Sequence, residues 1–276
     1  QYREYHYKPQ ELVHSAPQRP TVDLTKIHNS ENVLGLVLAF YVSFAVPARK
    51  TAAILKSVFN IKVSYQTVLN YAAAAAFYCH TFNLAHKGQI DAISAGDETY
   101  IKVMGKYQYV FFFISSRNLK ITAYHVADNR GTQPAIIAMN EALRTATPEQ
   151  KITLVTDGNP SYPAGIHFLN AQKGDLTPIQ HQKVIGLQNL DAESEEWRPF
   201  KQLIERLNRT YKYHVRPAAG FNSNNGAVAL TTLFVTHYNF LRPHMSLLYK
   251  TPIHLPELAT ISTIQGKWAK IISLAA

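Results

Sequence analysis

The stretch DAISAGDETYIKVMGKYQYVFFFIS, residues 91–115, is where the hydrophobic pattern of the chain changes from helical to extended. It contains two runs rich in β-branched and aromatic residues, and such runs favour strands over helices. Met104 and Gly105 separate the two runs and are enough for the tight turn of a hairpin. The stretch therefore predicts two strands joined by a turn.

The residues that follow predict a sheet with helices packed on it. A third strand is expected over 119–128, a helix over 132–146 and a fourth strand over 151–158. The remaining expected elements are a short helix near 161–170, a fifth strand around 181–187, and helices over 195–213 and 223–240. Three meander strands followed by alternating helices and strands are typical of an α/β domain, a mixed sheet flanked by helices.

The residues before the hairpin predict a helical region. Residues 1–30 lack a clean period and contain three prolines, which favours an extended arm or linker. Residues 31–90 are expected to be all helical, and 47–84 has the pattern of a helix-turn-helix. In this pattern Asn60 ends one helix and Ser64 caps the next. The alternative is a helical bundle that only docks on the α/β domain.

The composition indicates a globular protein with a polyanionic partner. Apolar residues make up 46% and charged residues 17% of the 276 residues, which leaves room for a large core. The formal net charge of +10 favours nucleic acid or an anionic membrane surface. The longest uncharged apolar run, 33–48, is shorter than the roughly 20 residues of a membrane-spanning helix. The single cysteine, Cys79, excludes a disulfide within the chain.

Three carboxylates stand out by their context. Asp97 lies within the first expected strand and Asp157 ends the fourth, and open α/β sheets place their sites beyond strand ends. A helical wheel places Glu205 on a polar face, apart from the apolar stripe of its helix. Each acid also has a structural explanation: a turn for Asp157, a cap or local pair for Asp97, and for Glu205 an ion pair with Arg209 worth roughly 0.2–0.5 kcal/mol.

Together the three acids suit a site for divalent cations beside DNA. Hard cations such as Mg²⁺ take oxygen ligands and keep waters and substrate phosphates in their shell. Two such ions about 4 Å apart stabilise the attacking and leaving oxygens of a phosphoryl displacement. Basic residues surround Glu205, so the acid would hold metal while its neighbours hold DNA. We therefore expect a nuclease or strand-transfer site.

Four segments in order carry a resemblance to a known family: GDETYIKVMGKYQYVFFFIS, LVTDGNPSYP, LIERLNRTYKYHVRPAAGFNS and HYNFLRPH. Over roughly 91–255 the chain resembles bacterial insertion-sequence transposases of the DDE type, with a retroviral-integrase-like, ribonuclease-H-like catalytic domain. The resemblance implies that Asp97, Asp157 and Glu205 are catalytic and ligate two divalent ions, Mg²⁺ or Mn²⁺. It further suggests a DNA-binding helix-turn-helix domain at 31–90, the catalytic domain at 91–255 and a C-terminal tail at 256–276.

The identity of the third ligand leaves alternatives open. Between Asp157 and Glu205 lie 47 residues, more than is common in related integrases, and the extra length is expected as loop between 170 and 200. Four acids of that region are rival ligands: Asp191, Glu193, Glu195 and Glu196. We favour Glu205, because its ERLNRT context matches the family and a loop offers no helix to fix the rivals.

DNA contacts are expected in two places. Around the helix of Glu205, five residues would contact phosphates: Lys201, Asn208, Arg209, Lys212 and Arg216. In the helix-turn-helix, the helix that starts at residue 65 would meet base edges in the major groove through Tyr65, Gln66, Thr67 and Asn70.

These observations predict a DNA transposase of the bacterial cytoplasm, associated with the nucleoid. It would cleave a strand at the ends of its element and use the freed 3′-hydroxyl to attack target DNA. The alternatives are a structure-selective nuclease with the same metals and a DNA-binding regulator without catalysis. The expected partner is double-stranded DNA and not a membrane, and joining two ends favours a homo-oligomer. The apolar helix over 33–46 would bury Leu38 and Val42 against a second subunit or the catalytic domain.

Overall fold

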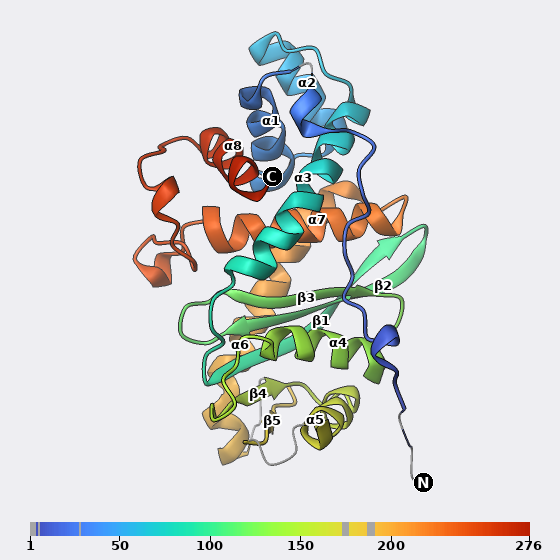
Figure 1. Ribbon diagram of the computed structural model, residues 1–276, viewed down its shortest axis with the longest axis vertical. Helices are drawn as coiled ribbons and strands as arrows, with labels where there is room; N and C mark the ends of the chain where they lie inside the picture. The colour runs from blue at the N-terminus through green and yellow to red at the C-terminus, as the bar shows by residue number, and fades with distance from the viewer. Residues whose placement is uncertain (1–3, 5, 28, 173–176, 187–190) are drawn as a thin grey trace. The chain divides into compact units, whose positions relative to one another are not determined.

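The computed structural model describes residues 4, 6–27, 29–172, 177–186 and 191–276, and the chain forms two compact units. The sheet unit contains residues 1–15, 88–101 and 107–209. The helical unit contains residues 16–87, 102–106 and 210–276. The ribbon in Figure 1 shows the elements of both.

A five-stranded mixed sheet forms the centre of the sheet unit, with the strand order β3-β2-β1-β4-β5. The strands are β1 (Ile93–Val103), β2 (Lys106–Ser115), β3 (Ile121–Ala127), β4 (Thr153–Thr156) and β5 (Gln180–Lys183). β2 pairs antiparallel with β3, whereas β4 runs parallel to both β1 and β5. The expected hairpin, meander and mixed ribonuclease-H-like sheet are therefore confirmed.

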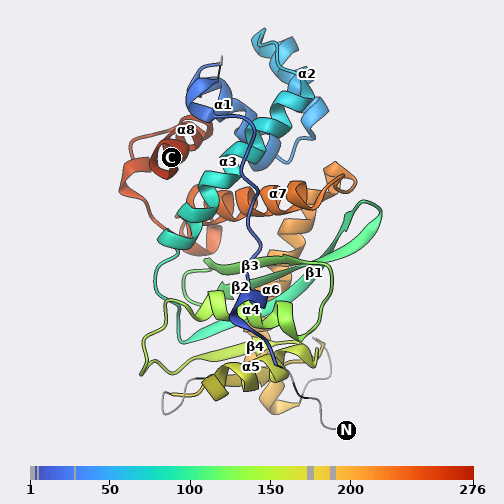
Figure 2. The ribbon, with the colours of Figure 1, turned by 45° about the vertical axis from the view of Figure 1, so that its right-hand side comes forward.

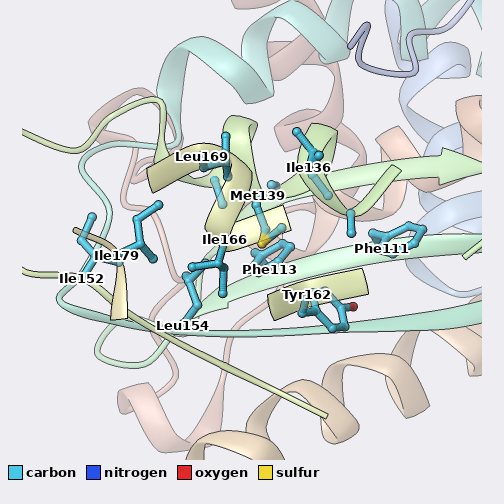
Figure 3. Close-up of a cluster of buried hydrophobic side chains, with 14 of the residues drawn as sticks. Phe111, Phe113, Ile136, Met139, Ile152, Leu154, Tyr162, Ile166, Leu169 and Ile179 are labelled. Atoms are coloured by element: carbon cyan, nitrogen blue, oxygen red, sulfur yellow. The ribbon is translucent and has the colours of Figure 1, made fainter. Parts of the chain in front are cut away.

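Helices cover both faces of this sheet (Figures 1 and 2). α4 (Thr132–Leu143) and α5 (Ser161–Gln172) lie on one face, and the first part of α6 (Ala192–Val215) lies on the other. Figure 3 shows the core under α4 and α5, where Phe111, Phe113 and Leu154 of the strands meet side chains of the helices. The helical residues of this core include Ile136, Met139, Tyr162, Ile166 and Leu169.

The start of α6 differs from the expected loop. The segment DAESEEWRP, residues 191–199, is helical from Ala192 onward, and Ser194 N–H donates to Asp191 Oδ1 over 2.7 Å at its start. The helix expected over 195–213 therefore begins three residues earlier, and it keeps Pro199 in its interior, where proline is usually excluded. Other parts of the expected insertion, 173–176 and 187–190, lie outside the described residues.

The helical unit is built around α3 (Tyr65–His86), which packs against α7 (Asn224–Thr236) and α2 (Ala48–Phe59). α1 (Glu31–Leu38) continues as a π-helical turn, Ala39–Ser43, and packs against α8 (Ile264–Ala275). Asn60 adopts a left-handed conformation at the end of α2, with φ of 54°. Ser64 Oγ accepts from Thr67 N–H over 3.0 Å and so caps α3 as expected.

The tip of the β1–β2 hairpin belongs to the helical unit. There Val103 forms an isolated bridge to Phe221, and the N–H of Met104 donates to the carbonyl of Phe221 over 2.7 Å. The N–H of Phe221 donates in turn to the carbonyl of Lys102 over 2.8 Å. Gly220 precedes this bridge with φ of 115°, a value that residues with a side chain rarely adopt. A loop far along the chain therefore pairs with the hairpin tip.

The packing of the helical unit bears on two expectations from the sequence. Leu38 and Val42 are both buried within the unit, so the expectation that they form a subunit contact is wrong. Residues 264–275 of the expected tail form α8, whose Trp268 is fully buried. The division into four domains stays a prediction.

Cys79 is also buried in the helical unit, and burial raises the pKa of its thiol to about 12. Within the described part of the chain, none of the helices combines the length and the hydropathy that crossing a membrane requires.

Candidate active site

Two adjacent acids in the middle of β1, Asp97 and Glu98, form the centre of the candidate site. Successive side chains of a strand point to opposite faces, so the two acids start from opposite sides of the sheet. Asp97 lies on the side of α6, where its Oδ2 contacts Lys201 Nζ at 3.2 Å and accepts from Asn208 Nδ2 at 3.1 Å. Glu98 lies on the side of α5, where Tyr162 donates its hydroxyl to Oε2 at 2.7 Å. Each acid is therefore fixed by a different helix.

Gly96, directly before these acids, is required by close packing. A side chain at this position would collide with the ring of Phe113 on the neighbouring strand β2. Glycine thus lets the aromatic core reach the backbone beside Asp97.

Asp157 follows the last residue of β4. The register pairs Ile93 with Thr153 and Ala95 with Val155, and its continuation places Asp157 opposite Asp97. The N–H of Asn159 donates to Asp157 Oδ1 over 2.9 Å and holds the carboxylate within the turn. The parallel pairing of β1 with β4 therefore brings the two aspartates together.

Asp97, Glu98 and Asp157 form one cluster, in which one carboxylate oxygen of each residue lies within 4.8 Å of those of the other two. Oxygen ligands at such spacing fit a divalent cation such as Mg²⁺. Asn208 Oδ1 is buried and has no hydrogen-bond partner in the described part of the chain, so it offers a further oxygen to an ion or its waters. The sequence analysis missed Glu98, although the adjacent pair Asp97-Glu98 in a strand was a visible signal.

The electrostatics of the cluster centre on Asp97. Burial raises the pKa of this carboxyl to about 6; the Lys201 ammonium opposes the rise, while the charges of Asp157 and Glu98 add to it. Burial, together with the charge of Glu98 and other acids, also raises the pKa of Tyr162 well above its usual range, so its hydroxyl remains a donor. The site thus concentrates negative charge, which Lys201 offsets at Asp97 and Arg130 offsets at Glu98.

Glu205 occupies the face of α6 that is turned to Asp97. It follows Lys201 by four residues and precedes Asn208 by three, and residues so spaced share one face of a helix. Both neighbours contact Asp97, and Glu205 itself is half-buried. Glu205 does not belong to the compact three-acid cluster of the described residues, so its role as third ligand stays a prediction.

The rival ligands lie on the first turns of α6 or just before them. Asp191 caps the helix through Ser194, and Glu195 is exposed and pairs with Arg198 at 3.7 Å. Glu196 is exposed as well, and the side chain of Glu193 lies outside the described residues. Our premise that no helix fixes these acids is corrected, because α6 already begins at Ala192.

The residues expected to contact phosphates differ in how deeply they are buried. Lys201 and Asn208 are buried against Asp97, whereas Arg209, the last residue of the sheet unit, is exposed. In the helical unit, Lys212 is half-buried and Arg216 is exposed.

Three of the four residues expected to read bases line a groove of about 620 Å³ within the helical unit. Tyr65, Gln66 and Asn70 form one wall, and residues 217–226 contribute to the other. The guanidinium carbon of Arg49 lies 4.7 Å above the centre of the Tyr65 ring. Thr67 differs from the other three, because its hydroxyl and N–H both bond to the Ser64 hydroxyl that caps α3. DNA binding by these residues stays a prediction.

A mixed five-stranded sheet with an acid cluster across β1 and β4 is the arrangement that the sequence analysis expects of a metal-dependent polynucleotidyl transferase. Residues 94–223 match the family model of a DDE domain, and residues 198–252 match that of an integrase core domain. These two matches confirm, over residues 94–252, the resemblance to DDE transposases and integrases seen in the sequence. A comparison with curated proteins finds no match.

Three solved structures are similar to the chain at low identity. The first is a simian T-cell lymphotropic virus intasome in complex with PP2A regulatory subunit B56 gamma, at 17% identity and a TM-score of 0.42, covering 85% of this chain and 78% of that chain. The HTLV-2 integrase catalytic core domain in complex with magnesium has 14% identity and a TM-score of 0.39, covering 59% and 94%. The Mos1 strand transfer complex has 10% identity and a TM-score of 0.28, covering 100% and 81%.

Proposed function

We propose that this chain is a transposase that cleaves strands at the ends of its element and joins the freed 3′-hydroxyl to target DNA. The observation that carries the proposal is the arrangement of Asp97 opposite Asp157, with Glu205 on the helix face whose neighbours contact Asp97. It is supported by the DDE domain match, which spans all three acids. The net charge of +10 suits a DNA substrate, and the bacterial nucleoid is the proposed location.

In this proposal Asp97, Asp157 and Glu205 hold two divalent cations, Mg²⁺ or Mn²⁺. Such ions stabilise the attacking and leaving oxygens of the displacement at phosphorus. Lys201 neutralises Asp97 before metal binds, and its ammonium is then available to a DNA phosphate. Asn208 orients Asp97 from the same helix, and the Asn159 turn orients Asp157. The protein's contribution is mainly positioning and charge.

The DNA contacts are proposed on both units. Arg209, Lys212 and Arg216 would bind phosphates, and the groove lined by Tyr65, Gln66 and Asn70 would contact bases. Two element ends must be joined in one reaction, so we propose that a homo-oligomer is the active form. Leu38 and Val42 are not part of its interface, because both are buried within the chain.

The test is a cleavage and joining assay with DNA that carries the element's terminal repeats. We expect Mg²⁺-dependent nicking at the ends, followed by covalent joining of the 3′-end to a target plasmid. Asp97→Asn, Asp157→Asn and Glu205→Gln should each abolish both steps while leaving DNA binding intact. Cleavage without joining would identify the nuclease alternative. Binding without any cleavage in Mg²⁺ or Mn²⁺ would identify the regulator.

A further inference from the structure

The carboxylate of Glu98 contacts donors from three residues of the sheet unit, one ahead of α4 and two at the start of α5. Its Oε1 lies 3.3 Å from Arg130 Nε and accepts from Asn159 Nδ2 at 3.0 Å, and its Oε2 accepts from Tyr162 at 2.7 Å. The side chain is only 5% exposed. A buried carboxylate with three donors is held in one orientation. Glu98 is therefore a fixed anchor within the acid cluster.

Arg130 is held at both ends beside this anchor. Its carbonyl accepts from Ser161 Oγ at 2.9 Å and from Asn159 Nδ2 at 3.4 Å, which fixes the backbone ahead of α4. Its ion pair with Glu98 uses Nε, and a guanidinium carries further N–H donors in a planar fork. The side chain is 54% exposed. A rigidly held arginine thus presents donors to solvent next to the acid cluster.

We propose that Arg130 binds a phosphate of the DNA strand that enters the acid cluster, and that Glu98 is the positioning residue that aims it. The proposal rests on the proposed function, because it assigns the strand to the same site. Three carboxylates repel a phosphodiester, and a guanidinium beside them offsets that repulsion through bidentate bonds to phosphate oxygens. Arg130 is a substrate-contacting residue that the sequence analysis did not single out.

The same contacts argue that Glu98 is an anchor rather than a principal metal ligand. A cation on Glu98 would compete with Arg130, Asn159 and Tyr162 for its lone pairs, and the guanidinium charge would oppose it. The Asp157 carboxylate has an oxygen in the cluster and accepts one hydrogen bond, from Asn159, among the described residues. The geometry thus assigns different roles to the acids: the two aspartates ligate metal, and Glu98 positions Arg130.

The experiment compares Arg130→Ala with Arg144→Ala as a matched control. Arg144 is also half-exposed, at 48%, and pairs with Glu141 at 3.0 Å, at the far end of the same helix α4. The probes are a fluorescent linear duplex for binding and a supercoiled plasmid with Mn²⁺ for nicking. Arg130→Ala should weaken duplex binding about tenfold, as expected for loss of a charge-assisted bond, and lower the salt slope by about one. Arg144→Ala should stay within about twofold of the parent protein.

Glu98→Gln tests the positioning role. If Glu98 acts through Arg130, the double variant Glu98→Gln/Arg130→Ala should bind DNA no more weakly than Arg130→Ala alone. A merely structural role for Glu98 would give additive losses instead. Arg130→Lys keeps the charge without the fork and should recover part of the affinity. Mn²⁺ binding in the absence of DNA should not weaken in Arg130→Ala, because a positive charge is removed from beside the cluster.

Two results would overturn the proposal: equal DNA binding by the Arg130→Ala and Arg144→Ala variants, or loss of Mn²⁺ binding in Glu98→Gln, which would make Glu98 a ligand. Thermal unfolding of each variant shows whether the fold is kept, and the Arg130→Lys variant carries the test if Arg130→Ala unfolds. If the parent protein binds DNA without cutting it and Arg130→Ala still weakens binding, the proposed function fails while the arginine assignment stands. If the parent cuts and Arg130→Ala matches the control, only the assignment fails.

Discussion

Among single residues, the ion pair between Lys201 and Asp97 stabilises the site in the absence of metal. Both side chains are largely buried, at 6% and 14% exposure. Removing one partner of such a pair leaves an uncompensated charge, which typically costs about 3 kcal/mol. We expect Lys201→Met to lower the free energy of unfolding by about this amount in chelator at pH 8. The loss should be smaller at lower pH, because removing the Lys201 ammonium raises the pKa of Asp97 further and protonation then neutralises the carboxylate.

The measurement is urea unfolding with and without Mn²⁺. The Lys201→Met variant should regain more stability from Mn²⁺ than the parent does, because the ion replaces the missing ammonium. Lys183→Met, at an exposed position at the end of β5, is the control and should change neither value. Equal stability of the parent and Lys201→Met in chelator would contradict the structural role of this pair.

How far single residues of the site could be predicted depends on the kind of contact. Asp97 and Asp157 were singled out because strand position and family motif agreed, and the β1–β4 register places them together. Glu98 was missed, because its place in the cluster depends on Asn159, Tyr162 and Arg130, which are distant in sequence. Lys201 and Asn208 were assigned to DNA phosphates, since a helical wheel does not show that Asp97 lies across from them.

At the scale of elements, α6 decides between Glu205 and its rivals. Asp191 already serves as a helix cap, so Asp191→Asn should keep the cap and leave cleavage within about twofold, since asparagine caps equally well. Glu195→Gln should be equally harmless, because that side chain is exposed and pairs with Arg198. Glu205→Gln should abolish cleavage. Initial rates of plasmid nicking measure all three, and a loss of activity in Asp191→Asn alone would move the ligand to the start of the helix.

The π-helical turn after α7, His237–Leu241, carries a pH-sensitive histidine. Burial, with further contributions from His214, Arg242 and His244, lowers the pKa of His237 to about 3. Above about pH 6.5 the residue is neutral in both folded and unfolded chains; below it only the unfolded chain takes up the proton. Stability should therefore fall by up to about 1.4 kcal/mol per pH unit from this residue as pH drops from about 6.5 toward 3.

His237→Asn removes this titration while keeping a polar group near Ser43, whose Oγ lies 3.1 Å from Nδ1 of the native ring. Free energies of unfolding at pH 7.5 and pH 5 should differ less in the variant than in the parent protein. The same loss of stability in both would show that His237 is not the source.

Elements were predicted better than their ends. The meander, the alternating helices and the Ser64 cap were expected from periodicity and turn chemistry, which are local. The start of α6 was not, since the segment 191–199 was interpreted as inserted loop although the expected helix began at residue 195, and α6 in fact begins at Ala192. α1 was expected to seek a partner because it is apolar on all faces, and the sequence did not show that α8, more than 200 residues later, packs against it.

At the scale of the whole molecule, the net charge of +10 should dominate DNA affinity. Lys212→Ala should weaken binding to duplexes of any sequence and reduce the salt slope by about one. Lys26→Ala is the control, because Lys26 is exposed and pairs with Asp23 at 3.6 Å. Fluorescence anisotropy over a range of salt concentrations measures both slopes. A change in sequence preference without a change in slope would contradict a phosphate contact.

Each of the two compact units is built from segments that are not continuous in the sequence. Residues 102–106 of the hairpin tip belong with residues 210–276, through the bridge between Val103 and Phe221. A domain boundary drawn as one cut in the sequence cannot describe this pairing, because the bridge joins segments more than 100 residues apart. Composition and motifs nevertheless located the sheet, its order of elements and the two aspartates.

The burial of Cys79 has a practical consequence for spectroscopy. The thiolate is the reactive form of cysteine, and a thiol whose pKa is about 12 in a closed core reacts slowly with maleimides. A cysteine introduced at an exposed position such as Tyr213 or Leu248 would therefore take up a fluorophore alone. The native chain thus serves directly as the background for site-specific dyes, and energy transfer between such a dye and labelled DNA can follow binding in real time.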